Sequence, residues 1–161
     1  MNIYILRHGE AEPASAELRD ADRPLTSQGK RDLQAVLKVA RRMEVKPDVI
    51  LTSPLTRARQ TAHLASSVLK CKNVVQTKHL NPNVRPDLLW KELCALKKAD
   101  HLVVAGHEPH LSSFIGFLFV ATILVDLKKS SLVRIETKPN HGPPRGILKW
   151  MLTPRMAEAL R

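Results

Sequence analysis

Short apolar runs alternate along the chain with longer segments in which apolar residues recur every three or four positions. The runs at residues 3–6, 48–52, 74–77 and 101–105 predict buried β-strands. The periodic segments between them predict amphipathic helices. Because strands that alternate with helices form a mostly parallel sheet covered on both faces, the pattern predicts an α/β fold, a three-layer α/β/α sandwich.

The predicted helices begin at recognisable signals. Thr26 is expected to cap the first helix, and Pro86 opens a later one. Ser53 and Pro54 are expected to be the N-cap and first residue of the helix between these two. The apolar residues 114–125 predict a further helix. They fall short of the about 20 residues that a membrane span requires, so a buried core helix is expected rather than a membrane segment.

The last part of the chain has a different pattern. Two strands, expected at residues 131–136 and 146–152, flank the turn-rich residues 139–144, which predicts a hairpin. The sheet should therefore be mostly parallel with an antiparallel C-terminal strand. Thr153 and Pro154 suit the start of a short last helix. Because no linker, repeat or low-complexity tract interrupts the chain, we expect a single domain over residues 1–161.

Charge and cysteine content narrow the function. The formal net charge of +11, from 26 Lys and Arg against 15 Asp and Glu, favours anionic partners, either as a basic solvated surface or by steering an anionic substrate. Nucleic acid is disfavoured, because the sequence lacks zinc-finger and RNP motifs and has two Trp, one Tyr and three Phe in all. Cys71 and Cys94 have no zinc-site spacing, and no signal peptide is recognisable. A cytoplasmic protein without metal or cofactor is expected.

Arginine and histidine follow three predicted strands where those strands end. Arg7-His8-Gly9 follows the first, Arg57 lies shortly after the second, and His107 follows the fourth. Parallel strands end at one edge of a sheet, where α/β proteins bind ligands. Arginine offers a fork of donors that matches phosphate oxygens, and a neutral imidazole is a nucleophile. Gly9 is expected to permit a tight turn and close approach of the backbone to the ligand. The pattern predicts a phosphate site containing a nucleophile.

Four motifs resemble, in the same order, those of the histidine phosphatase superfamily and of its small SixA-type branch of phosphohistidine phosphatases. They are Leu6-Arg7-His8-Gly9-Glu10, Arg23-Pro24-Leu25-Thr26-Ser27-Gln28-Gly29, Ser53-Pro54-Leu55-Thr56-Arg57-Ala58-Arg59-Gln60-Thr61-Ala62 and Gly106-His107-Glu108-Pro109. The resemblance implies a phosphoglycerate-mutase-like fold and a phospho-His8 intermediate. It also implies that Arg7, Arg57 and His107 hold the transferring phosphoryl oxygens, and that Arg23 lies at the rim and touches phosphate or substrate.

One departure from the superfamily bears on the substrate. The mutase and phosphomonoesterase branches use a glutamate after the third strand as general acid, and residues 79–87 contain none. An alkoxide leaving group needs a proton donor, whereas an imidazole leaves readily near pH 7. The expected substrate is therefore a phosphorylated histidine of a protein, such as a histidine-phosphotransfer domain or phosphocarrier. Asp87, Glu108 or Glu10 remains open as a proton donor.

Two alternatives remain. One is a phosphatase for small phosphomonoesters, which would show selectivity for alkyl esters. The other is a non-catalytic module that binds phosphate or nucleic acid, which would show salt-sensitive binding without phosphate release. His107 and His110 have a spacing that could suit a metal ion, but no further ligand accompanies them.

Overall fold

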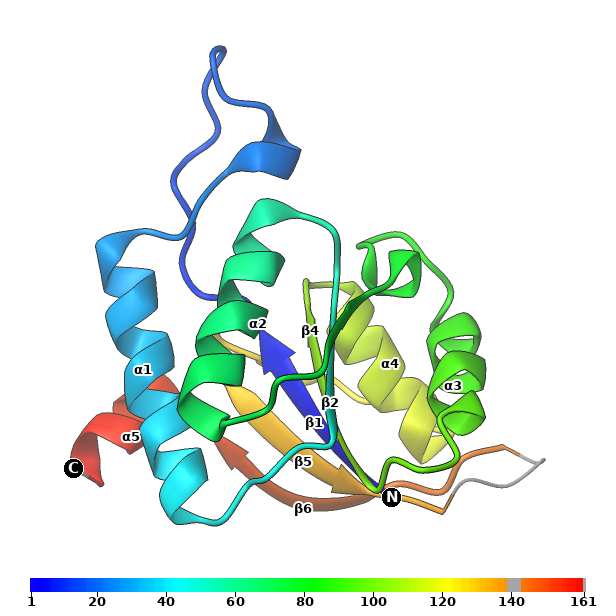
Figure 1. The fold of residues 1–161 in the computed structure, drawn as a ribbon. Helices are drawn as coiled ribbons and strands as arrows, with labels where there is room; N and C mark the ends of the chain where they lie inside the picture. Colours follow the sequence, from blue (N-terminus) through cyan, green and yellow to red (C-terminus); the bar gives the residue numbers. More distant parts are fainter. Residues whose placement is uncertain (139–142, 161) are drawn as a thin grey trace.

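The computed structural model describes residues 1–138 and 143–160 and, within these ranges, contains one sheet of six strands (Figure 1). The strands are β1 (Asn2–Arg7), β2 (Val49–Thr52), β3 (Val74–Gln76), β4 (His101–Gly106), β5 (Leu132–Glu136) and β6 (Ile147–Leu152). Their order across the sheet is β3-β2-β4-β1-β5-β6. Strands β1 to β4 run parallel, β5 pairs antiparallel with β1, and β6 pairs antiparallel with β5. The predicted mostly parallel sheet with antiparallel pairing at the C-terminus is confirmed.

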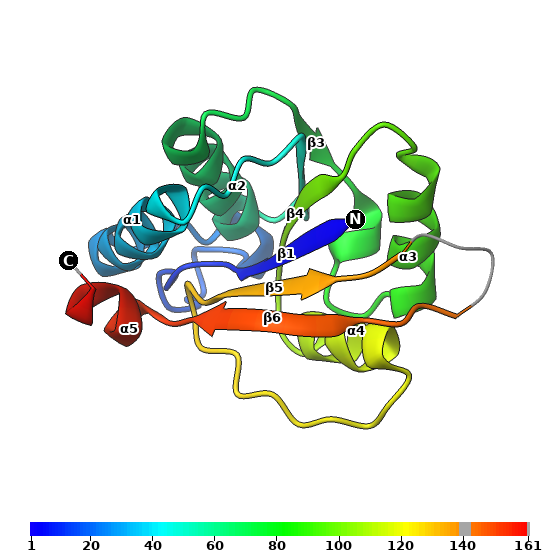
Figure 2. The same cartoon turned by 90° about the horizontal axis from the view of Figure 1, so that it is seen from below.

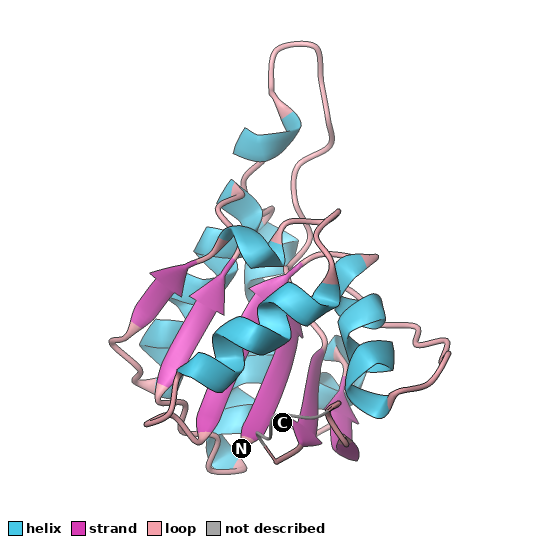
Figure 3. Cartoon of the chain, turned by 90° about the vertical axis from the view of Figure 1, so that its right-hand side faces the viewer, coloured by secondary structure: helices cyan, strands magenta, loops and turns pink. Residues whose placement is uncertain are grey.

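Helices cover both faces of the sheet, as Figures 2 and 3 show. One layer contains α1 (Ser27–Arg42), α2 (Thr56–Leu69) and α5 (Pro154–Ala159), and the other contains α3 (Pro86–Ala95) and α4 (His110–Phe119). Two short 3-10 turns, η1 (Asp20–Asp22) and η2 (Lys78–Leu80), lie in the connections. The predicted three-layer α/β/α architecture is confirmed.

The apolar runs occupy the centre of the sheet because each strand there faces a core on both sides. In β1, Tyr4 and Leu6 pack in the core beneath α1, α2 and α5, whereas Ile3 and Ile5 pack in the core beneath α3 and α4. All four side chains are almost fully buried. Alternate residues of a strand point to opposite faces, so a strand covered on both sides needs a continuous apolar run.

Several local predictions agree with the structure. The Thr26 hydroxyl accepts a hydrogen bond of 2.9 Å from the Gly29 N–H at the start of α1. Pro86 is the first residue of α3, and the Thr153 hydroxyl accepts from the Met156 N–H at the start of α5. The β5–β6 pairing confirms the hairpin. Residues 139–142 of its predicted turn lie outside the described residues.

The predicted start of α2 at Ser53 and Pro54 was wrong. The helix begins at Thr56, and Leu55 occupies the N-cap position. Ser53 instead extends the pairing of β2 with β4, because its N–H donates to the Ala105 carbonyl at 3.1 Å. Its hydroxyl accepts from the Leu55 N–H at 3.3 Å and so closes a local turn before the helix. A Ser-Pro pair suits either a helix start or a turn, and the pairing of Ser53 with β4 selects the turn.

The predicted helix over residues 114–125 also needs correction. Helix α4 ends at Phe119, and Val120 takes a left-handed conformation (φ 53°) whose N–H caps the last turn. The Leu124 side chain is fully exposed, so apolar composition overstates the length of the core helix. Among the described residues, no helix combines the length and apolar character that crossing a membrane would require.

Candidate active site

The candidate site lies where β1, β2 and β4 end beside one another. Arg7, the last residue of β1, is in register with Gly106 of β4, and Ala105 is in register with Thr52 of β2. The N–H of His8 donates to the Gly106 carbonyl at 3.1 Å. His8 and His107 therefore each follow one of two neighbouring strands that pair with each other, as the strand order predicts.

The His8 and His107 rings face each other across the strand ends. Their centroids are 4.9 Å apart, their planes make an angle of 54°, and both side chains are buried. His8 Nδ1 lies 2.7 Å from the Gly9 carbonyl oxygen. A carbonyl only accepts hydrogen bonds, so Nδ1 carries the proton and Nε2 keeps a free lone pair. His8 thus has the form that a nucleophile requires.

The His107 ring has no hydrogen-bond partner among the described residues. Both of its nitrogens are buried and unpaired in the described part of the chain. A buried polar group without a partner costs free energy, and such groups in native proteins are often completed by a ligand. An oxygen of a bound anion between the two rings would supply the missing contact.

Burial keeps both rings neutral at pH 7. Loss of solvation lowers the pKa of His8 to about 4; its hydrogen bond to Gly9 opposes that shift, and the positive charges of Arg57, Arg7 and Lys129 add to it. Burial, followed by the nearness of His8 and Arg57, lowers the pKa of His107 to about 3. The site therefore combines two uncharged imidazoles, one of which has a free lone pair, with nearby positively charged side chains.

These pKa values predict that the protein loses stability in acid. A histidine of the unfolded chain binds a proton near its ordinary pKa of 6.5, whereas folded His8 does so only near 4. Between these values the unfolded state binds more protons, so the free energy of unfolding falls as pH falls. His8 alone should contribute on the order of 3 kcal/mol to this loss.

Urea unfolding at about pH 7 and about pH 4.5 measures the loss. His107→Gln removes one of the three histidine rings that are buried in the described chain and should reduce the difference between the two conditions. His63→Gln is the matched control, because His63 is exposed on α2, and it should keep the full difference. If the free energy of unfolding of His107→Gln changed between the two pH values as much as that of the wild type, the lowered pKa of His107 would be contradicted.

Arg57 lies in the first turn of α2 and is buried. Its Nη1 donates to the backbone carbonyl of Asp20 at 2.7 Å, and its Nη2 to the Asp20 carboxylate at 3.1 Å. Arg7 donates from Nη1 to the Leu127 carbonyl at 2.6 Å, while its buried Nε has no partner among the described residues. Both guanidiniums are close enough to His8 to lower its pKa.

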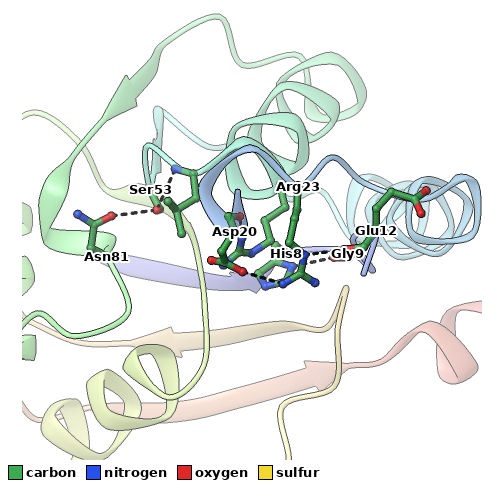
Figure 4. Close-up of polar contacts among 9 residues, drawn as sticks. His8, Gly9, Glu12, Asp20, Arg23, Ser53 and Asn81 are labelled. Carbon is green, nitrogen blue, oxygen red and sulfur yellow. Dashed lines mark hydrogen bonds and ion pairs between the residues drawn. The ribbon is translucent and has the colours of Figure 1, made fainter. Parts of the chain in front are cut away.

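Arg23 reaches the site through Asp20. Its Nη1 donates to Asp20 Oδ1 at 2.8 Å, and its Nε donates to the Glu12 carbonyl (Figure 4). One carboxylate thus joins Arg23 of the connecting segment to Arg57 of α2. Asp20 was not predicted as a site residue, because residues 10–24 have no periodicity. The available signal for Asp20 was its position, three residues before Arg23 of the second motif.

Gly9 lies where the structure leaves no space for a side chain. It has no positive φ, as is true of every glycine that the structure describes, so no left-handed turn requires it. A Cβ at Gly9 would lie 2.6 Å from Leu33 Cδ1 and 2.9 Å from the Gly29 carbonyl oxygen. Gly9 therefore permits the loop after β1 to pack directly against α1, and its N–H donates to Thr61 Oγ1 at 3.2 Å.

The segment that precedes β5 adds residues to the site that were not predicted. The Ser130 N–H donates to the His8 carbonyl at 3.2 Å, and its hydroxyl is buried without a partner in the described chain. The adjacent Lys129 lowers the pKa of His8. These residues reach the site because β5 pairs with β1 across more than a hundred positions of sequence, a contact that no local pattern reveals.

The three open proton donors have different surroundings. Asp87 is paired with Arg85 at 2.9 Å and with Lys91 at 3.5 Å. Glu10 is paired with Lys129 at 3.7 Å. Glu108 directly follows His107, and its Oε1 is buried without a partner in the part of the chain described. No group of three or more His, Cys, Asp or Glu residues within the described ranges could hold a metal ion.

Comparison with known proteins identifies the family of this chain. The family profile of the histidine phosphatase superfamily (branch 1) matches residues 3–81. An uncharacterised protein of Picosynechococcus sp. is 33% identical over 116 residues, which cover 71% of this chain and 70% of the relative.

Solved structures share the fold at low sequence identity. The protein histidine phosphatase SixA complexed with tungstate has a TM-score of 0.89 and 22% identity, with both chains fully covered. The mycobacterial glucosyl-3-phosphoglycerate phosphatase has a TM-score of 0.72 and 14% identity, covering 92% of this chain and 97% of its own. A phosphoserine phosphatase from Entamoeba histolytica has a TM-score of 0.71 and 15% identity, with coverage of 96% and 98%.

Proposed function

Because the chain belongs to the histidine phosphatase superfamily, we propose that this phosphatase removes phosphate from a phosphorylated histidine of another protein, through a phospho-His8 intermediate. One observation carries the proposal: a buried imidazole with a free Nε2 lies beside a second imidazole whose nitrogens are unpaired among the described residues, and two guanidiniums are near the first ring. The substrate would be a histidine-phosphotransfer domain or phosphocarrier in the cytoplasm.

The first step exchanges one imidazole for another. The lone pair of His8 Nε2 forms a bond to phosphorus, and the P–N bond of the substrate breaks. Its electron pair returns to the substrate nitrogen, while the other ring nitrogen keeps its proton, so a neutral histidine leaves. His8 becomes phosphorylated on Nε2 and keeps its Nδ1 proton on the Gly9 carbonyl.

The second step returns the enzyme to its starting form. Water attacks the phosphorus of phospho-His8, the electron pair of the P–N bond returns to Nε2, and inorganic phosphate takes the proton of the water. Arg7, Arg57 and His107 would bind the phosphoryl oxygens through both steps. Positioning and charge stabilisation of this kind account for most catalysis of phosphoryl transfer, and the guanidiniums supply the charge without a metal ion.

The leaving group favours phosphohistidine. Imidazole leaves as a stable neutral species and needs no general acid near pH 7. Asp87 is held in two ion pairs and Glu10 in one, so neither is set up to protonate an alkoxide. The missing glutamate of residues 79–87 and these contacts together support P–N rather than P–O cleavage.

One observation favours the alternative of small phosphomonoesters. Glu108 follows His107 directly, and its buried Oε1, which has no partner among the described residues, could bind a proton for an ester leaving group. Three of the similar folds belong to enzymes with different substrates by name, so the fold does not select one.

A substrate comparison tests the proposal. Phosphate release should be measured from a phosphohistidine protein, from sugar phosphates and from p-nitrophenyl phosphate, at equal concentrations. We expect the phosphohistidine protein to have the largest kcat/KM. Preference for alkyl esters would replace the proposal by the phosphomonoester alternative. Salt-sensitive binding without release of phosphate from any substrate would indicate a non-catalytic binding module.

A further inference from the structure

The Asp20 carboxylate accepts hydrogen bonds from arginine donors that the proposed phosphate site needs. We propose that Asp20 is a specificity-determining residue. It favours a substrate whose phosphoryl group is bonded to a positively charged ring, an N-phosphorylated imidazolium, over phosphate esters. The inference rests on the proposed function and names the feature of the site that would select phosphohistidine.

The contacts of Asp20 join two arginines from different parts of the chain. Oδ2 accepts from Arg57 Nη2 at 3.1 Å, and Oδ1 accepts from Arg23 Nη1 at 2.8 Å. The Arg57 side chain is 8% exposed, whereas the Asp20 side chain is 61% exposed. These two ion pairs, led by the one with Arg23, lower the pKa of Asp20. Asp20 is therefore a carboxylate ion at the open side of a buried guanidinium.

An incoming phosphoryl group meets this carboxylate directly. Its oxygens would take the donors that Asp20 occupies on Arg57, while the backbone carbonyl of Asp20 still holds Nη1 at 2.7 Å. Two anions then compete for one guanidinium and repel each other over a few ångströms. Asp20 also influences His107, which places its charge near the histidine pair. Every phosphoryl substrate is penalised by this charge.

The leaving group decides whether the penalty is offset. An N-phosphorylated imidazolium has a ring N–H and a positive charge, so it can donate to the displaced carboxylate. The bridging oxygen of a phosphate ester has neither. Asp20 should therefore discriminate between the two classes by charge, independently of their size.

The same turn offers a matched control. Asp22, two residues later in η1, pairs with Arg19 at 2.6 Å, and that arginine side chain is 83% exposed. Asp22→Asn removes the same charge from the same turn without changing a contact to Arg57 or Arg23. Asp20→Glu keeps the charge and should retain most of the selectivity.

The test compares Asp20→Asn, Asp20→Glu and Asp22→Asn with the wild type on free N-phosphohistidine and on p-nitrophenyl phosphate. We expect Asp20→Asn to lower the ratio of the two kcat/KM values by about tenfold, the usual effect of one charged hydrogen bond. Tungstate, which has no leaving group, should bind Asp20→Asn about tenfold more tightly as the competing charge is lost. Asp22→Asn should match the wild type in both measurements.

The outcomes separate this inference from the proposed function. Equal changes of both kcat/KM values, with unchanged tungstate affinity, would show a merely structural Asp20 and overturn the inference. Absence of N-phosphohistidine and phosphohistidine-protein turnover in the wild type would instead overturn the proposed function. In that case the tungstate affinities of Asp20→Asn and the wild type still test whether the Asp20 carboxylate competes with a bound oxyanion. Equal affinities would overturn that competition.

Discussion

Replacement of His8 by alanine should abolish phosphate release, with a loss of roughly a thousandfold or more, as expected for removal of a covalent nucleophile. His8 Nε2 has the free lone pair of the site, because Nδ1 donates to the Gly9 carbonyl. A pKa of about 4 keeps the ring unprotonated at neutral pH. The measurement is phosphate release from the phosphohistidine protein, together with detection of an acid-labile, alkali-stable phosphoryl label on the enzyme.

His63→Ala is the control for His8→Ala. His63 is an exposed residue of α2, so this variant should keep both its turnover and its phosphoryl label. Urea unfolding of the three proteins separates loss of chemistry from loss of structure. A folded His8→Ala protein that still acquires the label would assign the nucleophile to another residue.

Arg57→Ala should lower the rate by roughly 10–150-fold, because a hydrogen bond to a charged group contributes about 1.5–3 kcal/mol. The guanidinium is buried at the start of α2 and influences both His8 and His107. The effect should appear in kcat if the contact is made mainly in the transition state. Arg57→Lys keeps the charge but loses the planar fork, so its rate should fall between those of Arg57→Ala and the wild type.

Arg59→Ala provides the comparison within the same helix. Arg59 is exposed, two residues beyond Arg57, and on a helix residues two apart point to different faces. Its removal lowers the net charge by the same amount and should leave turnover unchanged. Equal losses in Arg57→Ala and Arg59→Ala would indicate a general effect of charge, and an unchanged Arg57→Ala would contradict its proposed role.

The position of the site was predictable because parallel topology follows from local pattern. Apolar strands that alternate with amphipathic helices form a parallel sheet whose strands end at one edge. His8 and His107 follow such strands directly, so their meeting required no knowledge of distant contacts. The helix starts at Thr26 and Pro86 were equally predictable, since a helix start depends on the residues that immediately surround it.

The errors arose where a local signal competed with a distant partner. Ser53 suits a helix N-cap, but its N–H pairs with Ala105 and delays α2 to Thr56. The apolar residues after Phe119 suit a helix, but Val120 ends it in a left-handed conformation. In both cases several conformations satisfy the sequence, and tertiary packing selects one.

Local sequence patterns were enough to predict the layered fold, the edge of the sheet where the candidate site lies, and the residue types gathered there. Long-range packing determined that Asp20 contacts Arg57 across 37 positions of sequence, and that Ser130 adjoins His8. It also decided the charge of the two imidazoles, because burial lowers their pKa values and depends on every element packed around them. Local patterns determine which elements form, whereas desolvation and long-range ion pairs exist only after those elements have packed together.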